Sequence, residues 1–583
     1  MTGIRKSHRQ HDGELRVQRR RGVPPSVAAS IAGAISDDMP PGLVEFYRGL
    51  QFLPLAVTDE RGALHVTLLC NPVTSAPTSE RLELRARVNA EDPFVRAITA
   101  PHPGPRPFAG VAIDFSRRAR VKLGGVVESA VLGADGTLVL GVHANEHMGN
   151  CPKYITARQL RPTRRTPHTT TSSRTLSDDA KALLLEASTL FVATRHIDVD
   201  PSESDLGLNH RGGRPGFVRY LEDETGGHLV LPDYSGNRFY QSLGNVETDA
   251  VMGLAVPDFA SGALLQVSGR ARNLFDDEAD RLMPGATLVT VVSIDTAALT
   301  TGALDLELVG PEALSPYNPP VRRLARERPA DRTLVELKAQ LVDITVEARA
   351  ISTFTFELPA PADVVPGGHA IFDFSEHMKR WYQHMNDRYP QSLNDDHVRT
   401  YTVSRLSPDR RRLSITVKKS GAVSSFLHSL SMRSAPLAVT LKGYGGTFTC
   451  FEEGRALNRM VWVAGGVGLT PFLAMYRALR QAGQPMPDVE LLYACRLDEV
   501  QLVRELEGMD VKVFDSSPNA SPPDARPHAF HHRRLQAGDL AASRLLDRAT
   551  VFVCGPPAFM AAVTSWLEPR VDASRVRLER FQY

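Results

Sequence analysis

The sequence predicts a multidomain protein in which antiparallel β-barrels precede an α/β domain with a parallel sheet. The chain has 583 residues, several times the length of an ordinary domain. Two segments, residues 161–179 and 313–333, are rich in Thr, Ser, Pro or charged residues and have the composition of linkers. In the last part of the chain the apolar pattern changes from strand-like to alternating strands and helices.

The charge balance and the cysteines exclude several classes of function. Lys and Arg number 68 and Asp and Glu number 66, so the net charge of +2 gives no reason to expect nucleic-acid binding. There is no apolar run long enough for a membrane span and no signal-peptide core at the N-terminus. The five cysteines are scattered without a CxxC pair, so we expect a reducing, cytoplasmic location without zinc or an iron–sulfur cluster.

Residues 1–160 and 180–312 form two blocks that resemble each other. Both contain short β-rich runs, such as LHVTLLCN and LFVATRHI, broken by Gly, Asn and Asp turns, which predicts antiparallel barrels. GVAIDFSRRARVKLGG at 110–125 aligns with GLAVPDFASGALLQVSG at 253–269, so an Asp-Phe pair and a closing glycine recur 144 residues later. We interpret this as a duplicated barrel, with a chance match as the alternative.

The third block changes character along its length. Residues 334–455 continue as β-rich runs such as STFTFEL and LSITVKK, which predicts another antiparallel barrel. Residues 456–583 alternate strands with helical patterns, for example MVWVAG followed by TPFLAMYRALRQ. This alternation predicts a parallel sheet with helices on its faces.

The stretch VWVAGGVGLTPFLAM, residues 461–475, joins a buried strand to a helix. Its glycines allow a tight turn and close approach of a ligand to the backbone, Thr470 is a good N-cap and Pro471 a good first helical residue. Backbone N–H groups and the positive end of the helix dipole suit a pyrophosphate. Tight packing without a ligand is the alternative explanation of the glycines.

Three further motifs occur at matching positions: RTYTVS at 399–404, GAVSSFLH at 421–428 and VCGPPAFM at 553–560. Together with the GGVG loop, and in this order, they resemble the ferredoxin-NADP reductase superfamily over residues 334–583. The resemblance implies an FAD-binding barrel at 334–455 and an NAD(P)-binding α/β domain at 456–583. It also implies that NADPH or NADH reduces the FAD.

The resemblance assigns roles to residues of the RTYTVS and VCGPPAFM motifs. Arg399 would pair with the FAD phosphate, Tyr401 would lie against the isoalloxazine ring, and Thr402 would lie near its reactive nitrogen. Arg suits a phosphate and an aromatic ring can cover a flavin face, although a strand-end ion pair and a core tyrosine would leave the same pattern. The resemblance places Tyr401, Thr402 and Cys554 together as the catalytic group. Cys554 belongs to it because it would lie next to the nicotinamide, and we do not expect its thiol to act as a nucleophile.

The remaining residues of these motifs would bind cofactor without taking part in the chemistry. Ser404 belongs to the strand motif, and Gly421 and Ser424 would present an N–H and a hydroxyl to the FAD pyrophosphate. The nicotinamide dinucleotide would contact Gly465, Gly466, Gly468, Thr470, Cys554, Gly555 and Pro556. Arg496 follows the strand VELLYAC where such reductases often carry an arginine for the NADPH 2′-phosphate, and a surface salt bridge is the alternative.

Two segments of the third block are less defined. SEHMKRWYQHMNDRYPQSLNDDHV, residues 375–398, is longer than a compact reductase needs there, and would cover the FAD adenine, dock a partner or form a solvated excursion. The C-terminus LERFQY resembles the family's ending, so Phe581 or Tyr583 would cover the flavin, with a frayed tail as the alternative. HAFHHRRL has three histidines but no nearby acid or thiol in sequence, so no metal site is expected.

The N-terminal half resembles the pyridoxamine-phosphate-oxidase-type split barrel, which binds FMN. The resemblance covers residues 8–310 and depends on HDGELRVQRRRGV, GNCPKYI, NHRGGRPGFVRY and LPDYSGNRFYQSLGN. An FMN phosphate needs cationic and N–H donors, and the candidates are Arg211, Arg214, Asn237, Arg238 and Asn245. Hairpin turns with solvated arginines are the alternative, and the first barrel, which lacks RGGRPGFV, is expected to be structural.

The sequence therefore predicts an NAD(P)H-dependent flavoprotein oxidoreductase. Hydride would pass from NAD(P)H to FAD, and electrons would continue either to FMN or to a small-molecule or redox-protein acceptor. A reductase that feeds a partner, and a flavin- or nucleotide-binding sensor without turnover, are the alternatives. The oligomeric state stays open between monomer and homodimer, because the internal duplication can supply both halves of a barrel pair.

Overall fold

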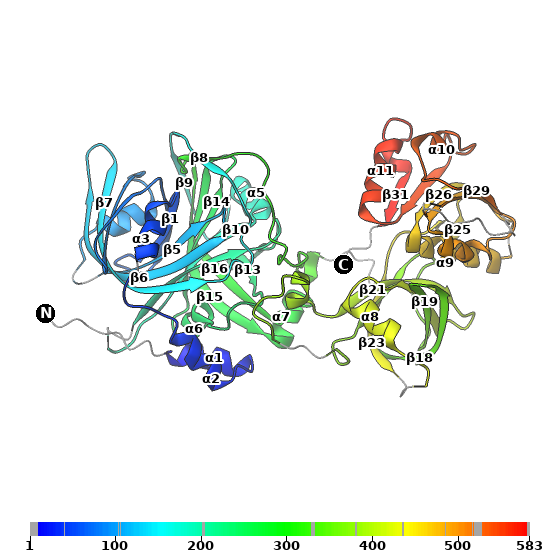
Figure 1. The fold of residues 1–583 in the computed structure, drawn as a ribbon, viewed down its shortest axis with the longest axis horizontal. Helices are drawn as coiled ribbons and strands as arrows, with labels where there is room; N and C mark the ends of the chain where they lie inside the picture. The colour runs from blue at the N-terminus through cyan, green and yellow to red at the C-terminus, as the bar shows by residue number, and fades with distance from the viewer. Residues whose placement is uncertain are drawn as a thin grey trace. The chain divides into compact units, whose positions relative to one another are not determined.

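The computed structural model describes residues 10–39, 41–102, 104, 106–200, 204–327, 333–378, 382–433, 437–483, 485–515, 517 and 528–579. The chain divides into two compact units (Figure 1). The first unit comprises Met1–Glu327 and Tyr382–Asp395, and the second comprises Arg328–Trp381 and Asp396–Tyr583. The first unit is therefore built from two separate stretches of the chain.

The first unit contains two large antiparallel sheets with the same strand order. One sheet runs β2-β1-β5-β6-β7-β4-β3 and the other runs β11-β10-β14-β15-β16-β13-β12, which is the same order with every strand number raised by nine. Their strands are β1 (Phe52–Thr58), β2 (Leu64–Cys70), β3 (Val73–Thr78), β4 (Arg81–Arg87), β5 (Arg106–Asp114), β6 (Ala119–Leu132), β7 (Thr137–Asn150), β10 (Thr189–His196), β11 (Asp205–Gly212), β12 (Arg219–Asp223), β13 (Gly226–Pro232), β14 (Val251–Asp258), β15 (Ala263–Phe275) and β16 (Leu288–Thr301). The internal repeat in the sequence thus corresponds to a repeated topology.

The closing glycine of each repeat is required for the same physical reason. A Cβ on Gly125 would lie 1.9 Å from the carbonyl oxygen of His143, and a Cβ on Gly269 would lie 2.1 Å from that of Ser293. Both glycines lie at a register shift between paired strands, β6 with β7 and β15 with β16. A bulge that brings two backbones this close accepts only glycine.

The two sheets pack against each other through a shared aromatic core. Phe115 and Phe259, the phenylalanines of the repeated Asp-Phe pair, meet edge to face with ring centroids 5.5 Å apart. Phe52 contacts both, at 5.1 Å and 5.4 Å. Each of these rings is at least 97% buried, so they remove a large apolar area from water. The two sheets therefore share one apolar core, in addition to the separate core that each has on its own.

Short strands and helices complete the first unit. Helix α1 (Asp12–Arg20) lies on α6 (Gln241–Thr248), where Gly13 and Gly244 allow the backbones to touch, since a Cβ on Gly13 would lie 2.1 Å from the Gly244 oxygen. The other elements are α2 (Pro25–Ala32), α3 (Pro41–Arg48), α4 (Pro93–Thr99), β8 (Leu160–Pro162), β9 (His168–Ser173), α5 (Asp178–Glu186), α7 (Asp276–Leu282), β17 (Leu306–Leu308), η2 (Ala325–Glu327) and η3 (Pro390–Asn394). Of the expected linker 161–179, therefore, β8, β9 and the start of α5 are regular structure.

The second unit contains a closed antiparallel barrel and a parallel sheet. The barrel order is β18-β19-β22-β21-β20-β23, and the parallel sheet order is β29-β28-β27-β26-β30-β31. The strands are β18 (Thr333–Ala348), β19 (Ile351–Glu357), β20 (His369–Asp373), β21 (Val398–Leu406), β22 (Arg412–Lys418), β23 (Ala438–Gly445), β24 (Phe451–Glu452), β25 (Arg455–Ala456), β26 (Arg459–Gly465), β27 (Asp488–Cys495), β28 (Asp510–Asp515), β29 (Ala529–His531), β30 (Thr550–Cys554) and β31 (Val576–Glu579). The expected change from antiparallel barrel to parallel sheet is confirmed.

Helices cover the parallel sheet and join it to the barrel. They are α8 (Ala422–Ser429), η4 (Gly466–Leu469), α9 (Thr470–Gln481), η5 (Leu497–Val503), α10 (Ala537–Ala541), α11 (Pro557–Leu567) and η6 (Ala573–Arg575). Arg477 of α9 donates to the carbonyl of Ser404 in the barrel and pairs with Glu505, with Nε 3.1 Å from Oε2. Burial of this cation is compensated by the ion pair. Within the described ranges, no helix is long and apolar enough to cross a membrane.

Candidate functional site

The GGVG loop joins β26 to α9 as the sequence predicted, with one difference at the helix start. A 3₁₀ turn, Gly466–Leu469, precedes the helix, and α9 begins at Thr470 with Leu469 as its N-cap. The Thr470 hydroxyl donates to the carbonyl of Val467 at 3.0 Å instead of accepting from a first-turn N–H. The expectation that Thr470 caps the helix is therefore corrected, because the 3₁₀ turn moves the helix start by one residue.

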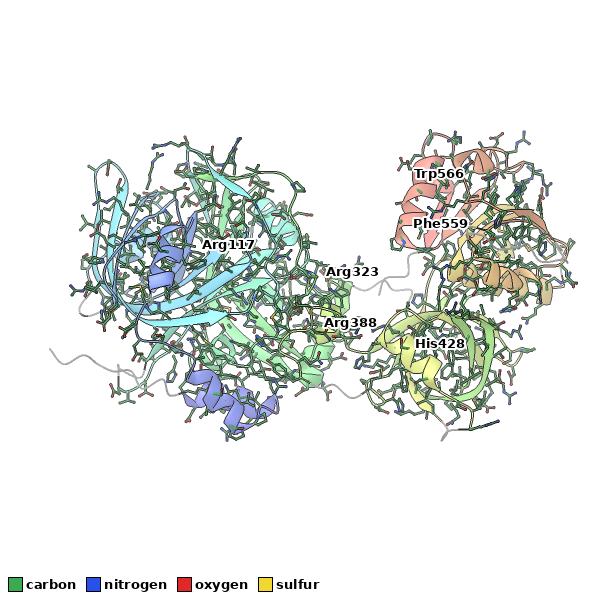
Figure 2. The ribbon with its side chains drawn as sticks, viewed as in Figure 1. Arg117, Arg323, Arg388, His428, Phe559 and Trp566 are labelled. Carbon is green, nitrogen blue, oxygen red and sulfur yellow. The ribbon has the colours of Figure 1, made fainter. Side chains whose placement is uncertain are left out.

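The glycines around this loop have different physical roles. A Cβ on Gly468 would lie 2.5 Å from the Cys554 carbonyl oxygen, and Cβ atoms on Gly465 and Gly555 would lie 2.9 Å and 2.7 Å from the Phe559 ring. Phe559 belongs to α11 (Figure 2). These three glycines are needed for packing between the loop and the CGP segment. Gly466 differs, because its φ is +53° and the nearest atom to its Cβ position is 3.7 Å away.

The open side of Gly466 faces a charged pair that the sequence analysis did not identify. The nearest atoms to its Cβ position are the Glu499 carboxylate at 3.7 Å and the Lys418 ammonium at 4.0 Å. Lys418 and Glu499 bond to each other at 2.6 Å. Glu499 also accepts from the backbone N–H of Arg496 at 3.2 Å. Their separation in the chain hid this pair, although Lys418 lies three residues before the GAVSSFLH motif.

Arg496 lies at the carboxyl end of β27, where the coenzyme phosphate was expected. Its side chain is exposed, and within the described part of the chain no carboxylate forms an ion pair with its guanidinium. The salt bridge considered as the alternative is thus not seen there. Ser517 lies beside it and accepts from the N–H of Leu497 at 2.9 Å. An exposed, unpaired guanidinium next to a hydroxyl is suited to a phosphate.

Cys554 ends β30 and is fully buried. Burial raises the pKa of its thiol well above the usual value, and the nearby Glu579 raises it further. A neutral, inaccessible thiol is not a nucleophile, so its contribution is packing, through the carbonyl that Gly468 approaches. Gly555 is buried beside it, and Pro556 is exposed as the N-cap of α11.

The RTYTVS motif forms most of β21, and its residues have different environments. Arg399 lies 3.8 Å from Asp396 and donates to the Val398 carbonyl. The Tyr401 ring packs against Phe372 and Phe374, each at 6.5 Å. Thr402 is 94% buried and is the register partner of His369 on the neighbouring strand β20. The side chains of Arg399 and Tyr401 are partly exposed, so a ligand can reach them.

Ser404 is part of the barrel interior. It is fully buried, and its hydroxyl bonds to the Ser414 carbonyl at 3.1 Å and the Thr416 hydroxyl at 2.9 Å. Its polar group is therefore satisfied within the protein.

Gly421 and Ser424 begin α8 with a local hydrogen-bond network. The Ser424 hydroxyl accepts from the N–H groups of Ser420 and Gly421 at 2.9 Å and 2.8 Å. Gly421 is exposed, and no atom lies within 4 Å of its Cβ position. The hydroxyl thus stabilises the helix start, and the backbone of Gly421 is the accessible part.

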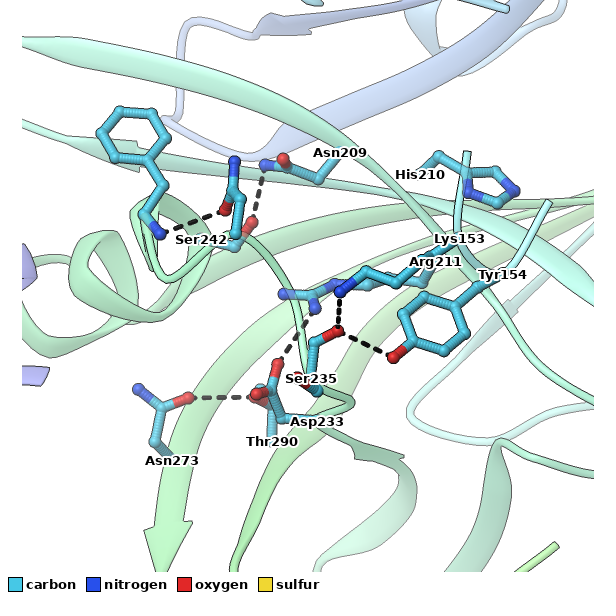
Figure 3. Close-up of polar contacts among 12 residues, drawn as sticks. Lys153, Tyr154, Asn209, His210, Arg211, Asp233, Ser235, Ser242, Asn273 and Thr290 are labelled. Carbon is cyan, nitrogen blue, oxygen red and sulfur yellow. Dashed lines mark hydrogen bonds and ion pairs between the residues drawn. The ribbon is translucent and has the colours of Figure 1, made fainter. Parts of the chain in front are cut away.

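A second candidate site is a cavity in the first unit, lined by residues of both large sheets. Its lining includes three of the five residues expected to hold FMN: Arg211, Asn237 and Arg238. Arg211 pairs with Asp233 at 3.0 Å, as Figure 3 shows. Arg120 and Lys122 of β6 add two cations from the first sheet. The first large sheet thus contributes to the lining, and the expectation that its block is structural stays a prediction.

Among the residues that line the cavity, three polar atoms are buried without a partner in the described part of the chain. They are Nε of Arg120, Nε2 of His210 and the hydroxyl of Tyr234. Arg120 donates to Nδ1 of His210 at 2.9 Å, so Nε2 of the neutral ring carries the proton. Burial and the adjacent Arg120 lower the pKa of His210 well below its usual value. The residues that line the cavity include the four cations Arg120, Lys122, Arg211 and Arg238 and the single acid Asp233, and this excess of positive charge suits an anionic ligand.

Arg214 and Asn245 do not line this cavity. Arg214 is exposed. Asn245 is fully buried on α6, where it bonds to His11 at 2.7 Å and to Asp205 at 3.0 Å. Helix α1 covers Asn245. The segment around Asn245 gives no sign of this contact, because α1 comes from the N-terminus of the chain.

The histidine-rich segment contacts an acid from another strand. His532 pairs with Asp515 at 2.9 Å, an acid that sequence proximity did not suggest. Within the described ranges, no group of three or more His, Cys, Asp or Glu side chains is arranged to hold a metal ion. Phe581 and Tyr583 lie outside the described residues.

Comparison with known proteins agrees with the geometry of the second unit. Residues 462–565 match the family described as "Oxidoreductase NAD-binding domain". The matched stretch lies within the second unit. It contains the GGVG loop, Arg496 and the CGP segment, which the fold brings to the carboxyl ends of neighbouring parallel strands. In open α/β sheets, this edge is where ligands bind.

Curated relatives include a flavohemoprotein of Deinococcus radiodurans, 30% identical over 196 residues, which cover 32% of this chain and 46% of that protein. The electron transfer component of toluate 1,2-dioxygenase from Pseudomonas putida is 29% identical over 212 residues, which cover 34% of this chain and 57% of that protein. The chain thus spans about half the length of these relatives. Among solved structures, the FAD/NAD-binding domain of nitric oxide dioxygenase from Vibrio cholerae covers 42% of this chain and 98% of its own, with 23% identity and a TM-score of 0.33.

Proposed function

We propose that the protein is an NAD(P)H-dependent flavin oxidoreductase that passes electrons from NAD(P)H through FAD to an acceptor. The observation that carries this proposal is the match of residues 462–565 to an oxidoreductase NAD-binding domain, together with an open loop at the expected strand edge. FAD supplies the redox chemistry when bound, whereas the protein supplies binding and orientation.

The NAD-binding domain would hold the coenzyme at the GGVG loop. The backbone of Gly466 is accessible and precedes α9, so first-turn N–H groups and the helix dipole favour a pyrophosphate there. Gly465, Gly468, Gly555 and Cys554 would shape this edge by packing. We infer a preference for NADPH over NADH from the exposed guanidinium of Arg496 beside Ser517.

The antiparallel barrel would hold FAD. The partly exposed Arg399 would pair with a phosphate, and the partly exposed Tyr401 would lie against the ring system. Thr402 would contribute through its position beside Tyr401. Gly421 would offer its accessible backbone at the start of α8, with Ser424 supporting that turn.

We propose the cavity of the first unit as the FMN site. Its lining combines four cationic side chains with one carboxylate, and this excess of positive charge fits an anionic group. Arg211, Asn237 and Arg238 belong to the same lining. Internal transfer from FAD to FMN and transfer to an external redox protein are both compatible with this arrangement. The second route has one observation in its favour, since a relative is named as an electron transfer component.

We further propose that the protein works as a monomer in the cytoplasm. The two large sheets share one aromatic core, so one chain supplies both halves of a barrel pair. All five cysteines are free, as expected in a reducing compartment. A stable dimer in size-exclusion chromatography with light scattering would contradict the monomer.

The decisive experiment is a flavin count on the purified protein together with NADPH oxidation. Heat release and chromatography give FAD and FMN per chain, and oxidation is followed with ferricyanide as an artificial acceptor. One FAD per chain with NADPH oxidation supports the reductase, and FMN in addition supports the internal route. A protein with neither flavin and no oxidation, also after incubation with added FAD and FMN, would contradict the proposal.

A further inference from the structure

The segment Tyr382–Asp395, here called the strap, lies in the sequence between two strands of the second unit's barrel but belongs to the first unit. Its Met385 and Leu393 pack against the core of the second large sheet. Asp387 accepts from the hydroxyl of Tyr317 at 2.6 Å, and Gln391 donates to the carbonyl of Asn318 at 3.1 Å. The strap is thus docked on the first unit through both apolar and polar contacts.

The strap is bonded to the loop that lines the cavity. The Tyr382 hydroxyl donates to the carbonyl of Gly236 at 3.1 Å, and Asn394 accepts from the N–H of Ser235 at 2.8 Å. The Arg238 guanidinium lies 3.4 Å from the centre of the Tyr382 ring. This is a close cation–π contact, which fixes the plane of a side chain that would otherwise have many rotamers.

Lys153 and Tyr154 also connect the strap to the same loop. The buried ammonium of Lys153 donates to the carbonyls of Ser235 at 2.7 Å and of His384, in the strap, at 2.6 Å. The Tyr154 hydroxyl donates to the Ser235 carbonyl at 2.7 Å and accepts from Asn394 at 2.9 Å. Figure 3 shows Lys153 and Tyr154 converging on Ser235. These bonds explain why the GNCPKYI segment combines a lysine with a tyrosine.

The backbone around the cavity is strained, which shows how firmly it is held. Tyr154, Arg238 and Tyr240 have φ values of +66°, +64° and +60°. Bulky residues adopt this left-handed region only where the surroundings fix them, and such positions are typical of ligand clamps. Gln18 of α1 holds the same loop from another side by donating to the Phe239 carbonyl at 3.1 Å.

We propose that the strap completes the cavity as a phosphate site, with Tyr382 as the positioning residue that fixes the Arg238 guanidinium for the phosphate of a flavin mononucleotide. This inference rests on the proposed FMN site. It adds that a residue from the C-terminal half of the chain determines phosphate affinity in the N-terminal barrels. Tyr382 does not line the cavity itself, so its effect passes through Arg238.

The test compares the binding of FMN and riboflavin to flavin-free full-length protein by fluorescence quenching. In Tyr382→Ala, FMN affinity should fall about tenfold while riboflavin affinity stays unchanged, because the loss concerns a phosphate contact. Tyr382→Phe keeps the ring and should retain FMN affinity. Tyr389→Ala is the matched control, since Tyr389 is a strap tyrosine that is 60% exposed. Arg238→Ala should behave as Tyr382→Ala.

Equal loss of both ligands in Tyr382→Ala, or loss of neither, would refute the proposal. If the unmodified protein binds no FMN, the proposed FMN site is refuted. A second assay then tests separately whether Tyr382 of the strap affects phosphate binding in the cavity. Cys151 lines the cavity and is the one partly exposed cysteine of the five, so its alkylation by iodoacetamide reports on the cavity. The proposal is supported if inorganic pyrophosphate protects Cys151 from alkylation and if Tyr382→Ala needs about tenfold more pyrophosphate for the same protection. Equal protection in both proteins, or no protection in either, overturns it.

Discussion

Substitution of single glycines at the coenzyme loop separates packing from ligand binding. In Gly468→Ala, the new methyl group would lie 2.5 Å from the Cys554 oxygen, 2.7 Å from its carbonyl carbon and 2.8 Å from the Gly555 Cα. All three are backbone atoms, and Cys554 ends β30, a strand paired on both sides. Overpacking typically costs 1–3 kcal/mol, and because the backbone here cannot give way we expect about 3 kcal/mol.

Gly466→Ala should show the opposite pattern. The nearest atom to its Cβ position is 3.7 Å away, so the cost is the left-handed conformation at φ +53°, about 1–2 kcal/mol for a residue other than glycine. The methyl group would lie beside Glu499 and Lys418, at the edge of the loop on which we place the coenzyme phosphates, so the KM for NAD(P)H should rise about tenfold. Gly421→Ala has no atom within 4 Å and a φ of −145°, and serves as the matched control for stability.

The assay is urea unfolding followed by tryptophan fluorescence, combined with steady-state kinetics. Of the three tryptophans in the sequence, Trp462 and Trp566 are described in the second unit, so their fluorescence reports on that unit. We expect the free energy of unfolding to decrease in the order control, Gly466→Ala, Gly468→Ala. If Gly468→Ala unfolds at the same urea concentration as the unmodified protein, the packing of the GGVG loop against the CGP segment is refuted.

Three further predictions concern single side chains. Arg496→Ala should raise the KM for NADPH about tenfold and leave that for NADH within about twofold, measured by absorbance at 340 nm; equal effects on both coenzymes would refute the phosphate contact. Ser404→Ala should lower the free energy of unfolding by about 1 kcal/mol through lost interior hydrogen bonds without changing FAD content, and a loss of FAD would contradict this. Burial and Asp205 raise the pKa of Glu14 to about 8, so the carboxyl group takes up a proton on folding. The free energy of unfolding should therefore fall as the pH rises from about 5 to about 8, and Glu14→Gln should remove this dependence. Equal pH profiles of stability for the unmodified protein and Glu14→Gln would refute this.

The sequence predicted the order of structural classes because local patterns determine it. Period-two runs with turn residues became antiparallel strands, and the strand–glycine–helix pattern became β26, η4 and α9. The duplicated sheets were visible because a bulge needs glycine at the same place in both copies, Gly125 and Gly269. These features depend on neighbours that are close along the chain or repeat at a fixed distance.

Features that depend on distant neighbours were not predictable. Gly466 and Gly468 are equivalent in sequence, but only Gly468 meets Cys554, a residue 86 positions later. Lys418 and Glu499 pair across 81 positions, and Asn245 is covered by a helix from the N-terminus. The environment of a polar side chain was therefore less predictable than the element on which it lies.

The strap has a consequence for the order in which the molecule is made. A chain emerging from the ribosome presents residues up to Glu327 long before Tyr382, and domains generally fold as they emerge. The two large sheets can therefore form their shared core while the cavity loop still lacks the contacts of Tyr382 and Asn394. The loop gains these contacts only after part of the C-terminal barrel has been synthesised, so a chain truncated before residue 382 would contain both sheets and an unfinished cavity.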